Sequence, residues 1–90
     1  MIKSFKDKNV ESIFNGECVK RMDRNLQDTI RRRLKYLNRA VSIDDLRIPP
    51  GNHFEKLAGR QEYSVRINDQ WRLTFLWDGG PVNVALEDYH

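Results

Sequence analysis

The chain has 90 residues and a net charge of +3 at neutral pH. This length predicts a single domain over residues 1–90 and excludes a second core. The basic balance, with a sequence pI near 9.2, favours a polyanionic partner, either a nucleic acid or an acidic protein. Cys18 is the only cysteine, which excludes an internal disulfide and a thiolate metal cluster, and we expect it to be a small buried hydrophobe. Without any apolar run that resembles a signal peptide or a membrane span, a cytoplasmic protein is expected.

The first 40 residues predict a short strand and two helices. Residues 2–5 are β-prone and can add a strand to a sheet. Asp7 is placed to cap a helix over residues 8–15, which Gly16 ends. A much longer helix is expected from about residue 19 to residue 39, because apolar residues recur every three or four positions along it.

The long helix also carries a crowded basic face. Such a run of charges is usually only a solvated helix face. The functional alternative is a flank that approaches nucleic-acid backbone, which supplies affinity and salt dependence without reading sequence. The candidates for this RNA contact are Arg31, Arg32 and Lys35.

The middle of the chain leads from helices to strands. Ser42 precedes acidic residues and predicts a single capped turn over residues 42–46. Residues 49–52, Pro-Pro-Gly-Asn, end helical structure and turn the chain. Residues 53–57 can form a strand, and residues 59–62 form the loop that follows. Helices first and strands afterwards indicate a compact α+β fold.

A β-hairpin over residues 63–77 organises the sheet half. Apolar residues alternate on both sides of a polar turn at residues 68–70, which predicts two half-buried strands. The predicted pairs are Ile67 with Trp71, Arg66 with Arg72, Val65 with Leu73 and Tyr63 with Phe75. This register places every apolar residue of the hairpin on one side.

The other side of the hairpin then carries Arg66 beside Arg72. Like charges directly opposite each other are unfavourable, so the pair makes most sense with an anion over it. Guanidinium groups match phosphate oxygens. Two solvated arginines on an exposed face are the alternative.

A last strand follows, predicted from the apolar alternation over residues 82–86. It carries Asp88, Tyr89 and His90 to the edge of the sheet. In an unbroken strand His90 shares the core-facing side with Leu86, and Tyr89 lies on the other side. Which of the two reaches the arginine face stays open.

The chemistry of this half suits metal-free RNA cleavage. The candidate residues are Lys56, Arg66, Arg72, Asp88, Tyr89 and His90. The RNA 2′-hydroxyl would attack the adjacent phosphorus while the cations stabilise the charge that builds on the phosphate. His90 would move a proton as general acid or base, and Tyr89 would stack on a base or assist. The alternatives are a terminal histidine without a role and a tyrosine in ordinary packing.

His53 is a further candidate for RNA contact, with a surface or turn position as the preferred alternative. His53, Asp88 and His90 lack the compact spacing of metal ligands. We therefore expect no metal site and no cofactor.

Four segments of the chain resemble the HigB-type toxins, the plasmid-maintenance killer proteins within the RelE superfamily of toxin-antitoxin systems. They are Pro-Pro-Gly-Asn at residues 49–52, Tyr-Ser-Val-Arg-Ile-Asn at 63–68, Gln-Trp-Arg-Leu-Thr-Phe at 70–75 and the closing Asp-Tyr-His at 88–90. Their joint occurrence is far more specific than any one of them. The resemblance covers essentially the whole chain.

The resemblance implies a RelE-like fold, with N-terminal helices packed on a small twisted antiparallel sheet, and ribosome-dependent cleavage of messenger RNA in the decoding A site. The family's functional positions fall on His90, Asp88, Tyr89, Arg66 and Arg72, and more loosely on Lys56. One departure is the loop at residues 59–62, which is shorter than the family's glycine- and basic-rich loop. It bears on whether Arg60 contacts RNA.

The resemblance also implies partners. They are the small ribosomal subunit with its RNA, messenger RNA, and a helix-turn-helix antitoxin of the HigA kind, through which the toxin would reach operator DNA indirectly; a membrane is not among them. Two alternatives remain. One is a ParE-like toxin that poisons DNA gyrase, against which the terminal Asp-Tyr-His argues. The other is a non-enzymatic RNA-binding module.

Overall fold

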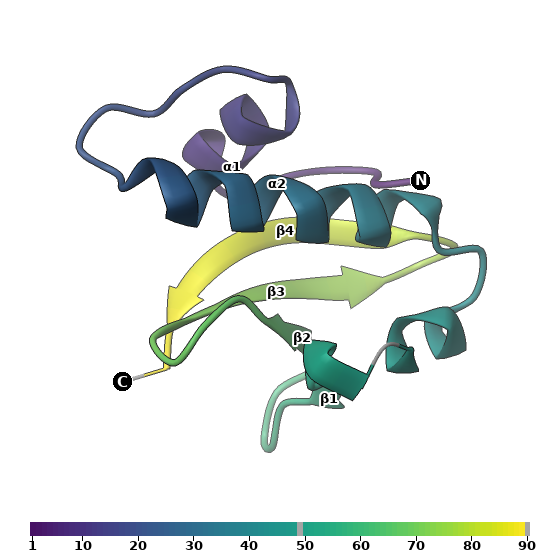
Figure 1. Cartoon of the computed structure of the whole chain (residues 1–90). Coiled ribbons are helices and arrows are strands. Elements are labelled where there is room, and N and C mark those ends of the chain that lie inside the picture. Colours follow the sequence, from purple (N-terminus) through teal and green to yellow (C-terminus); the bar gives the residue numbers. More distant parts are fainter. Residues whose placement is uncertain (49, 90) are drawn as a thin grey trace.

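The computed structural model describes residues 1–48 and 50–89; Pro49, part of the turn predicted at residues 49–52, and His90 lie outside the described residues. The elements in chain order are α1 (Lys8–Phe14), α2 (Arg24–Arg39), the 3-10 turns η1 (Ile43–Arg47) and η2 (Pro50–Asn52), and strands β1 (Glu55–Lys56), β2 (Tyr63–Arg66), β3 (Trp71–Trp77) and β4 (Pro81–Asp88). Figure 1 shows both α-helices above one face of the sheet. The predicted α+β fold, with N-terminal helices packed on an antiparallel sheet, is confirmed.

The sheet is antiparallel with the order β1-β2-β3-β4. In the central hairpin the structure pairs Val65 with Leu73 and Arg66 with Arg72, so the predicted register is confirmed. The Asn68 side-chain oxygen closes the turn by accepting the backbone N–H groups of the residues two and three positions on, at 2.8 and 2.9 Å. This local bond fixes the loop length, and the loop length fixes the register.

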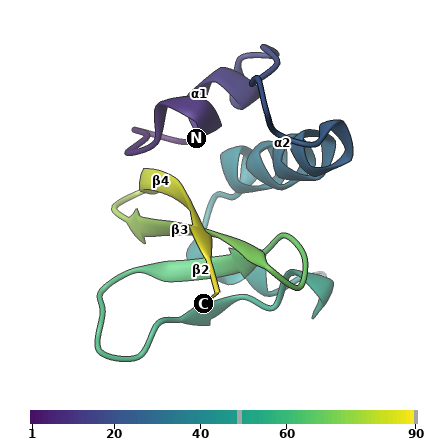
Figure 2. The same ribbon diagram turned by 90° about the vertical axis from the view of Figure 1, so that its left-hand side faces the viewer.

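The core lies between the helices and one face of the sheet. Its sheet side is built from the alternating residues Val65, Leu73 and Phe75, all at most 1% exposed. Its helix side is formed by the apolar residues Val10, Ile13, Ile30, Leu34 and Leu37, all fully buried. Figure 2 shows α1 and α2 together on this side of the strands. Each such side chain contributes about 1.5–3 kcal/mol by leaving water, so this face supplies most of the stability.

Helix α2 begins at Arg24, and the prediction that it starts near residue 19 was wrong. Arg21 has a φ of 66°, which a right-handed helix cannot contain. The helix instead takes Asp23 as its N-cap, whose carboxylate accepts the Leu26 N–H at 3.0 Å. Cys18 lies in the loop before this cap and is exposed, so its predicted burial was also wrong.

The buried side chain of Gln27 holds that loop in place. Its carbonyl oxygen accepts the Val19 N–H at 2.9 Å, and its amide donates to the carbonyls of Val19 and Met22 at 2.8 and 2.9 Å. Val19 and Met22 still pack against the core. The apolar spacing was therefore informative about burial, although hydrogen bonds to one glutamine replace the helical ones.

Other local predictions have mixed outcomes. Helix α1 with Asp7 as its N-cap and the capped turn at Ser42 are confirmed. Residues 2–5 do not form a full strand, since only Phe5 makes a β-bridge, parallel to Val84. The strand predicted at residues 53–57 is reduced to β1, which covers only Glu55–Lys56.

Within the described residues, no helix has the length and apolar character needed to cross a membrane.

Strand β4 reaches its partner through a bulge. The register with β3 shifts between Thr74 and Leu76, where Asn83 takes a φ of 55°. Beyond the bulge, Glu87 lies opposite Arg72. The Tyr89 N–H then donates to the Gln70 carbonyl at 2.8 Å, which ties the end of the chain to the central hairpin.

Candidate active site on the outer face of the sheet

The face of the sheet that points away from the helices is hereafter the outer face. It carries Ser64, Arg66, Arg72, Thr74 and Glu87, because these residues alternate with the apolar residues of the core. Ser64 and Thr74 are only 1% and 2% exposed. The outer face is therefore covered at its centre, although its side chains are polar.

The Glu87 carboxylate is the centre of this polar layer. Arg60 donates to its two oxygens from Nη1 and Nη2 at 2.9 and 2.7 Å, and the Thr74 hydroxyl donates at 3.0 Å. Arg72 lies slightly farther away, with Nη2 at 3.6 Å. The Arg60 bonds above all, helped by Thr74, lower the pKa of Glu87 to about 2 against the penalty of burial.

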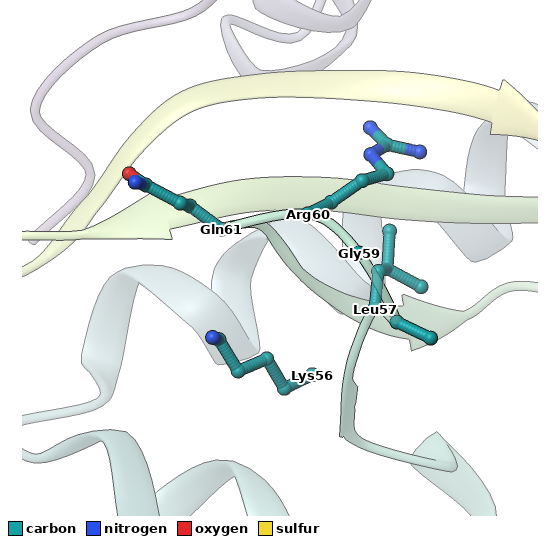
Figure 3. A pocket seen from close by; sticks show the side chains of 6 residues that line it. Lys56, Leu57, Gly59, Arg60 and Gln61 are labelled. Atoms are coloured by element: carbon teal, nitrogen blue, oxygen red, sulfur yellow. The ribbon is translucent and has the colours of Figure 1, made fainter.

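Arg60 reaches Glu87 from the loop between β1 and β2. Figure 3 shows its side chain extending toward β4, while Lys56 points the other way. A further bond from Nε to Glu62 at 3.2 Å fixes the same guanidinium, and both carboxylates raise the pKa of Arg60. The predicted RNA contact at Arg60 thus involves a guanidinium that already binds two carboxylates of its own chain.

Arg72 is held between Glu87 and Tyr89. Its guanidinium carbon lies 5.1 Å from the centre of the Tyr89 ring, a cation–π distance. Its side chain is 18% exposed, and its Nε is buried without a hydrogen-bond partner in the described part of the chain. Tyr89 therefore reaches the arginine face; His90, the other residue for which the sequence left this open, lies outside the described residues.

Arg66 binds the hairpin turn. Its Nε donates to the Asn68 carbonyl at 3.1 Å, and its Nη2 pairs with the carboxylate of Asp69, whose side chain is 96% exposed. The two neighbouring arginines thus each face a carboxylate of the chain, Asp69 for Arg66 and Glu87 for Arg72. These internal anions offset the like-charge repulsion across the strands.

A hollow of about 340 Å³ opens beside this pair and is lined by His53, Glu55, Arg66, Asp69 and Tyr89. It brings together a guanidinium, an imidazole and a phenol. Such a set can bind a phosphate and move a proton to or from it. His53 is exposed, as the preferred alternative expected, and it also lines the hollow.

Lys56 does not line this hollow. It pairs with Tyr63 in the β1–β2 ladder, whereas the neighbouring Glu55 pairs with Ser64. Its side chain lines a separate hollow of about 490 Å³ formed by the loop at residues 56–61 (Figure 3). The structure therefore does not bring Lys56 together with Arg66 and Tyr89.

Asp88 accepts a hydrogen bond from the Gln70 amide at 3.2 Å. It lies opposite Trp71 in the ladder, on the other side of the strand from Tyr89. His90, the predicted proton carrier, is outside the described residues. Of the two terminal candidates that the structure describes, Asp88 and Tyr89, only Tyr89 lines the hollow.

The helix cations lie on α2, which packs against the other face of the sheet. Arg31 is used locally, because its guanidinium donates to the carbonyls of Ile13 and Glu17 at 3.0 and 3.3 Å. Arg32 and Lys35 are exposed. All three are therefore separated from the outer-face hollow by the sheet itself.

Sequence reasoning missed the acidic residues of the site. Glu87 was not singled out, although it shares strand parity with Tyr89; its pairing with Arg72 depends on the bulge, which the sequence did not predict. Asp69 was treated only as part of a polar turn. Among the described residues, no group of three or more His, Cys, Asp or Glu side chains is arranged to hold a metal ion.

Comparisons with known proteins extend these observations over the whole chain. The model of the family described as RelE-like toxin of type II toxin-antitoxin system HigB matches residues 3–90. Toxin HigB-1 of Vibrio cholerae is 38% identical, over 99% of this chain and 98% of its own length. An uncharacterized protein of Haemophilus influenzae is 34% identical over 83% of this chain and 76% of its own length. Endoribonuclease HigB of Proteus vulgaris is 29% identical over the full length of both.

Proposed function

Because the chain belongs to the HigB-like family of RelE-like toxins of type II toxin-antitoxin systems, we propose that it is a ribosome-dependent endoribonuclease that cuts messenger RNA in the decoding site and thereby inhibits translation. The observation that carries this proposal is the hollow in which Arg66 and Tyr89 meet beside Arg72. The printed name of the Proteus relative, an endoribonuclease, supports the same activity.

The proposed reaction needs two proton transfers and a bound phosphate. The RNA 2′-oxygen forms a bond to phosphorus as its proton passes to a base, and the bond from phosphorus to the 5′-oxygen breaks as an acid protonates that oxygen. The products are a 2′,3′-cyclic phosphate and a free 5′-hydroxyl. DNA lacks the 2′-hydroxyl and is inert to this route.

Arg66 and Arg72 are proposed to bind the scissile phosphate. Charge builds on its oxygens in the transition state, where a placed donor contributes about 10²- to 10³-fold in rate. Asp69 holds Arg66 from an almost fully exposed position, so an incoming phosphate can replace it at little cost. The Arg72 side chain is 18% exposed and its buried Nε has no partner in the described chain, so a small shift of its side chain would present a further donor to the phosphate.

Three side chains are proposed to move the protons. The family resemblance favours His90, with Asp88 as its acidic neighbour. Tyr89 and His53 both line the hollow, which supports the proposal that they share this work. A histidine is suited to either role because its pKa lies near neutrality.

The remaining candidate residues are proposed to contact RNA outside the hollow. Lys56 lies on a neighbouring hollow and would bind flanking backbone. Arg32 and Lys35 are exposed on α2 and would add affinity that depends on salt. Arg31 has the same sequence-based assignment, but it would first have to release the carbonyls that it binds.

A toxin-antitoxin family implies an antitoxin partner. We propose a HigA-like helix-turn-helix antitoxin, through which the complex would bind operator DNA. The other proposed partners are the small ribosomal subunit and messenger RNA, and the proposed location is the cytoplasm.

The test is messenger RNA cleavage by purified wild type and His90→Ala, with and without programmed ribosomes, with the cut positions and product ends mapped. We expect cuts only with ribosomes, cyclic phosphate ends, and a loss of about 10²-fold or more in the variant. Cys18→Ser serves as the control, because Cys18 is exposed in the loop before α2.

Two results would contradict the proposal. Ribosome or RNA binding without any cleavage would identify a non-enzymatic RNA-binding module. Trapped gyrase–DNA complexes without RNA cleavage would identify a ParE-like toxin.

A further inference from the structure

The outer face carries a line of alternating charges, of which the proposed reaction uses only Arg72 and its neighbour Tyr89. Glu62 binds Arg60, Arg60 binds Glu87, and Glu87 lies beside Arg72, which contacts the Tyr89 ring. The line runs from the β1–β2 loop, across β4, to the residue that lines the hollow. One end, at Glu62 and Arg60, is the loop that departs from the family pattern. The other end, at Arg72 and Tyr89, belongs to the proposed catalytic site.

The distances along this line are unequal. Both Glu87 oxygens bind Arg60, at 2.7 and 2.9 Å, whereas the nearest nitrogen of Arg72 is 3.6 Å away. A carboxylate prefers to bind a guanidinium through two parallel bonds. Arg60 forms these two parallel bonds with Glu87. Glu87 therefore lies beside Arg72 and orients it, but at a longer distance than its bonds to Arg60.

This inequality matters for phosphate binding. A guanidinium fully paired with a carboxylate keeps its own charge, but the pair is neutral overall and few N–H donors are left for an incoming anion. Arg72 instead keeps a buried Nε without a partner in the described chain. The Tyr89 ring lies against the flat face of the Arg72 guanidinium, and the Glu87 carboxylate lies beside its Nη2 edge.

We propose that Glu87 and Arg60 are positioning residues for RNA cleavage: Glu87 orients Arg72 against Tyr89, and Arg60 occupies Glu87 so that this carboxylate does not capture Arg72. The inference rests on the proposed function of the same site. It gives Arg60 an internal role in place of the RNA contact that the sequence suggested.

The test compares Arg60→Gln, Glu87→Gln and the double variant on programmed ribosomes under single turnover. Arg60→Gln frees the carboxylate to pair with Arg72 and lowers the cleavage rate by about 30-fold. Removing that carboxylate as well makes the double variant about tenfold faster than Arg60→Gln, within the coupling seen for residues of one ion-pair network. Arg60→Lys, which keeps the charge, restores part of the rate.

A purely structural network gives the opposite order, with the double variant slowest and least stable. A double variant that is no faster than Arg60→Gln, with all variants folded by thermal melting, would overturn the proposal. Wild-type rates in both single variants would overturn it as well.

A second measurement does not depend on cleavage. Nitrogen-15 spectra of the arginine side chains should show newly protected Arg72 Nη–H signals in Arg60→Gln, absent from wild type and from the double variant. Unchanged Arg72 signals in Arg60→Gln would overturn the positioning role. The expected signals together with a wild type that cuts no ribosome-bound RNA would reject the proposed function and keep the network.

Discussion

The two faces of this sheet are both buried at their centres, but their chemistry is opposite. On the helix-covered face, Val65 and Leu73 are at most 1% exposed and entirely apolar. On the outer face, Ser64 and Thr74 are at most 2% exposed, and Thr74 donates to the Glu87 carboxylate that pairs with Arg60. Apolar burial stabilises a fold directly, whereas the Arg60–Glu87 ion pair, with side chains 34% and 27% exposed, is screened by water and adds little net stability.

The comparison teaches where stability and activity reside. The partly exposed ion pairs of the outer face contribute less stability than the apolar packing of the other face. A polar layer that adds little stability is better explained by the proposed work on a phosphate. Substitutions on the two faces should therefore separate folding from cleavage.

The largest effect is expected on the helix-covered face. Phe75→Ala removes a fully buried ring and should lower the free energy of unfolding by about 3–5 kcal/mol, a large part of the roughly 5–15 kcal/mol of a small domain. Urea unfolding measures this loss. A loss below about 1 kcal/mol would show that the helices do not pack on this face as described.

Arg72→Ala tests the outer face. Cleavage on ribosomes should fall about 10²- to 10³-fold, the effect of removing one transition-state donor, while the unfolding midpoint changes little. Arg60 still pairs with Glu87 in this variant, so no bare carboxylate is left behind. A collapse of the melting temperature, with the rate per folded molecule unchanged, would make Arg72 structural.

A smaller effect on stability is expected from Asp7→Ala, which tests how much the N-cap of α1 contributes to the helix-covered side of the sheet. Asp7 accepts the N–H groups of Asn9 and Val10 and so caps α1. Its loss should cost about 1 kcal/mol in thermal or urea unfolding, without an effect on kcat. Asp7→Asn, which also caps helices well, is the control and should recover most of the stability.

The smallest effect concerns the acid dependence of the outer face. The pKa of Glu87 is about 2 in the folded chain and near its ordinary value of 4.5 when unfolded. The stabilisation from its ionised form is thus fully present above pH 4.5 and is lost as the pH falls toward 2. The stability difference between wild type and Glu87→Gln should shrink over that window, and a constant difference would contradict it.

The fold was largely predictable because its strongest signals are local. The hairpin register follows from alternation and a three-residue turn that Asn68 closes. The start of α2 was not predictable from apolar spacing, because Gln27 satisfies the preceding loop from a distance.

The site was predictable in its residue types but less so in its geometry. Arg66 and Arg72 were placed side by side, as found. The partnership of Glu87 with Arg60 depends on the bulge at Asn83 and on the path of a loop, and neither has a local sequence pattern. Lys56 lies away from the hollow because it pairs with Tyr63, whereas the neighbouring Glu55 pairs with Ser64, a register that the poor alternation of residues 53–57 did not predict.

The most direct test compares two double variants on programmed ribosomes, with folding checked for each. Arg66→Ala/Arg72→Ala changes the outer face, and Arg32→Ala/Lys35→Ala changes the exposed face of α2. We predict that the first lowers kcat by about 10³-fold or more, while the second only raises KM and weakens the salt dependence. Normal cleavage by the outer-face variant, or a loss of kcat confined to the helix variant, would contradict the assignment of RNA cleavage to the outer face.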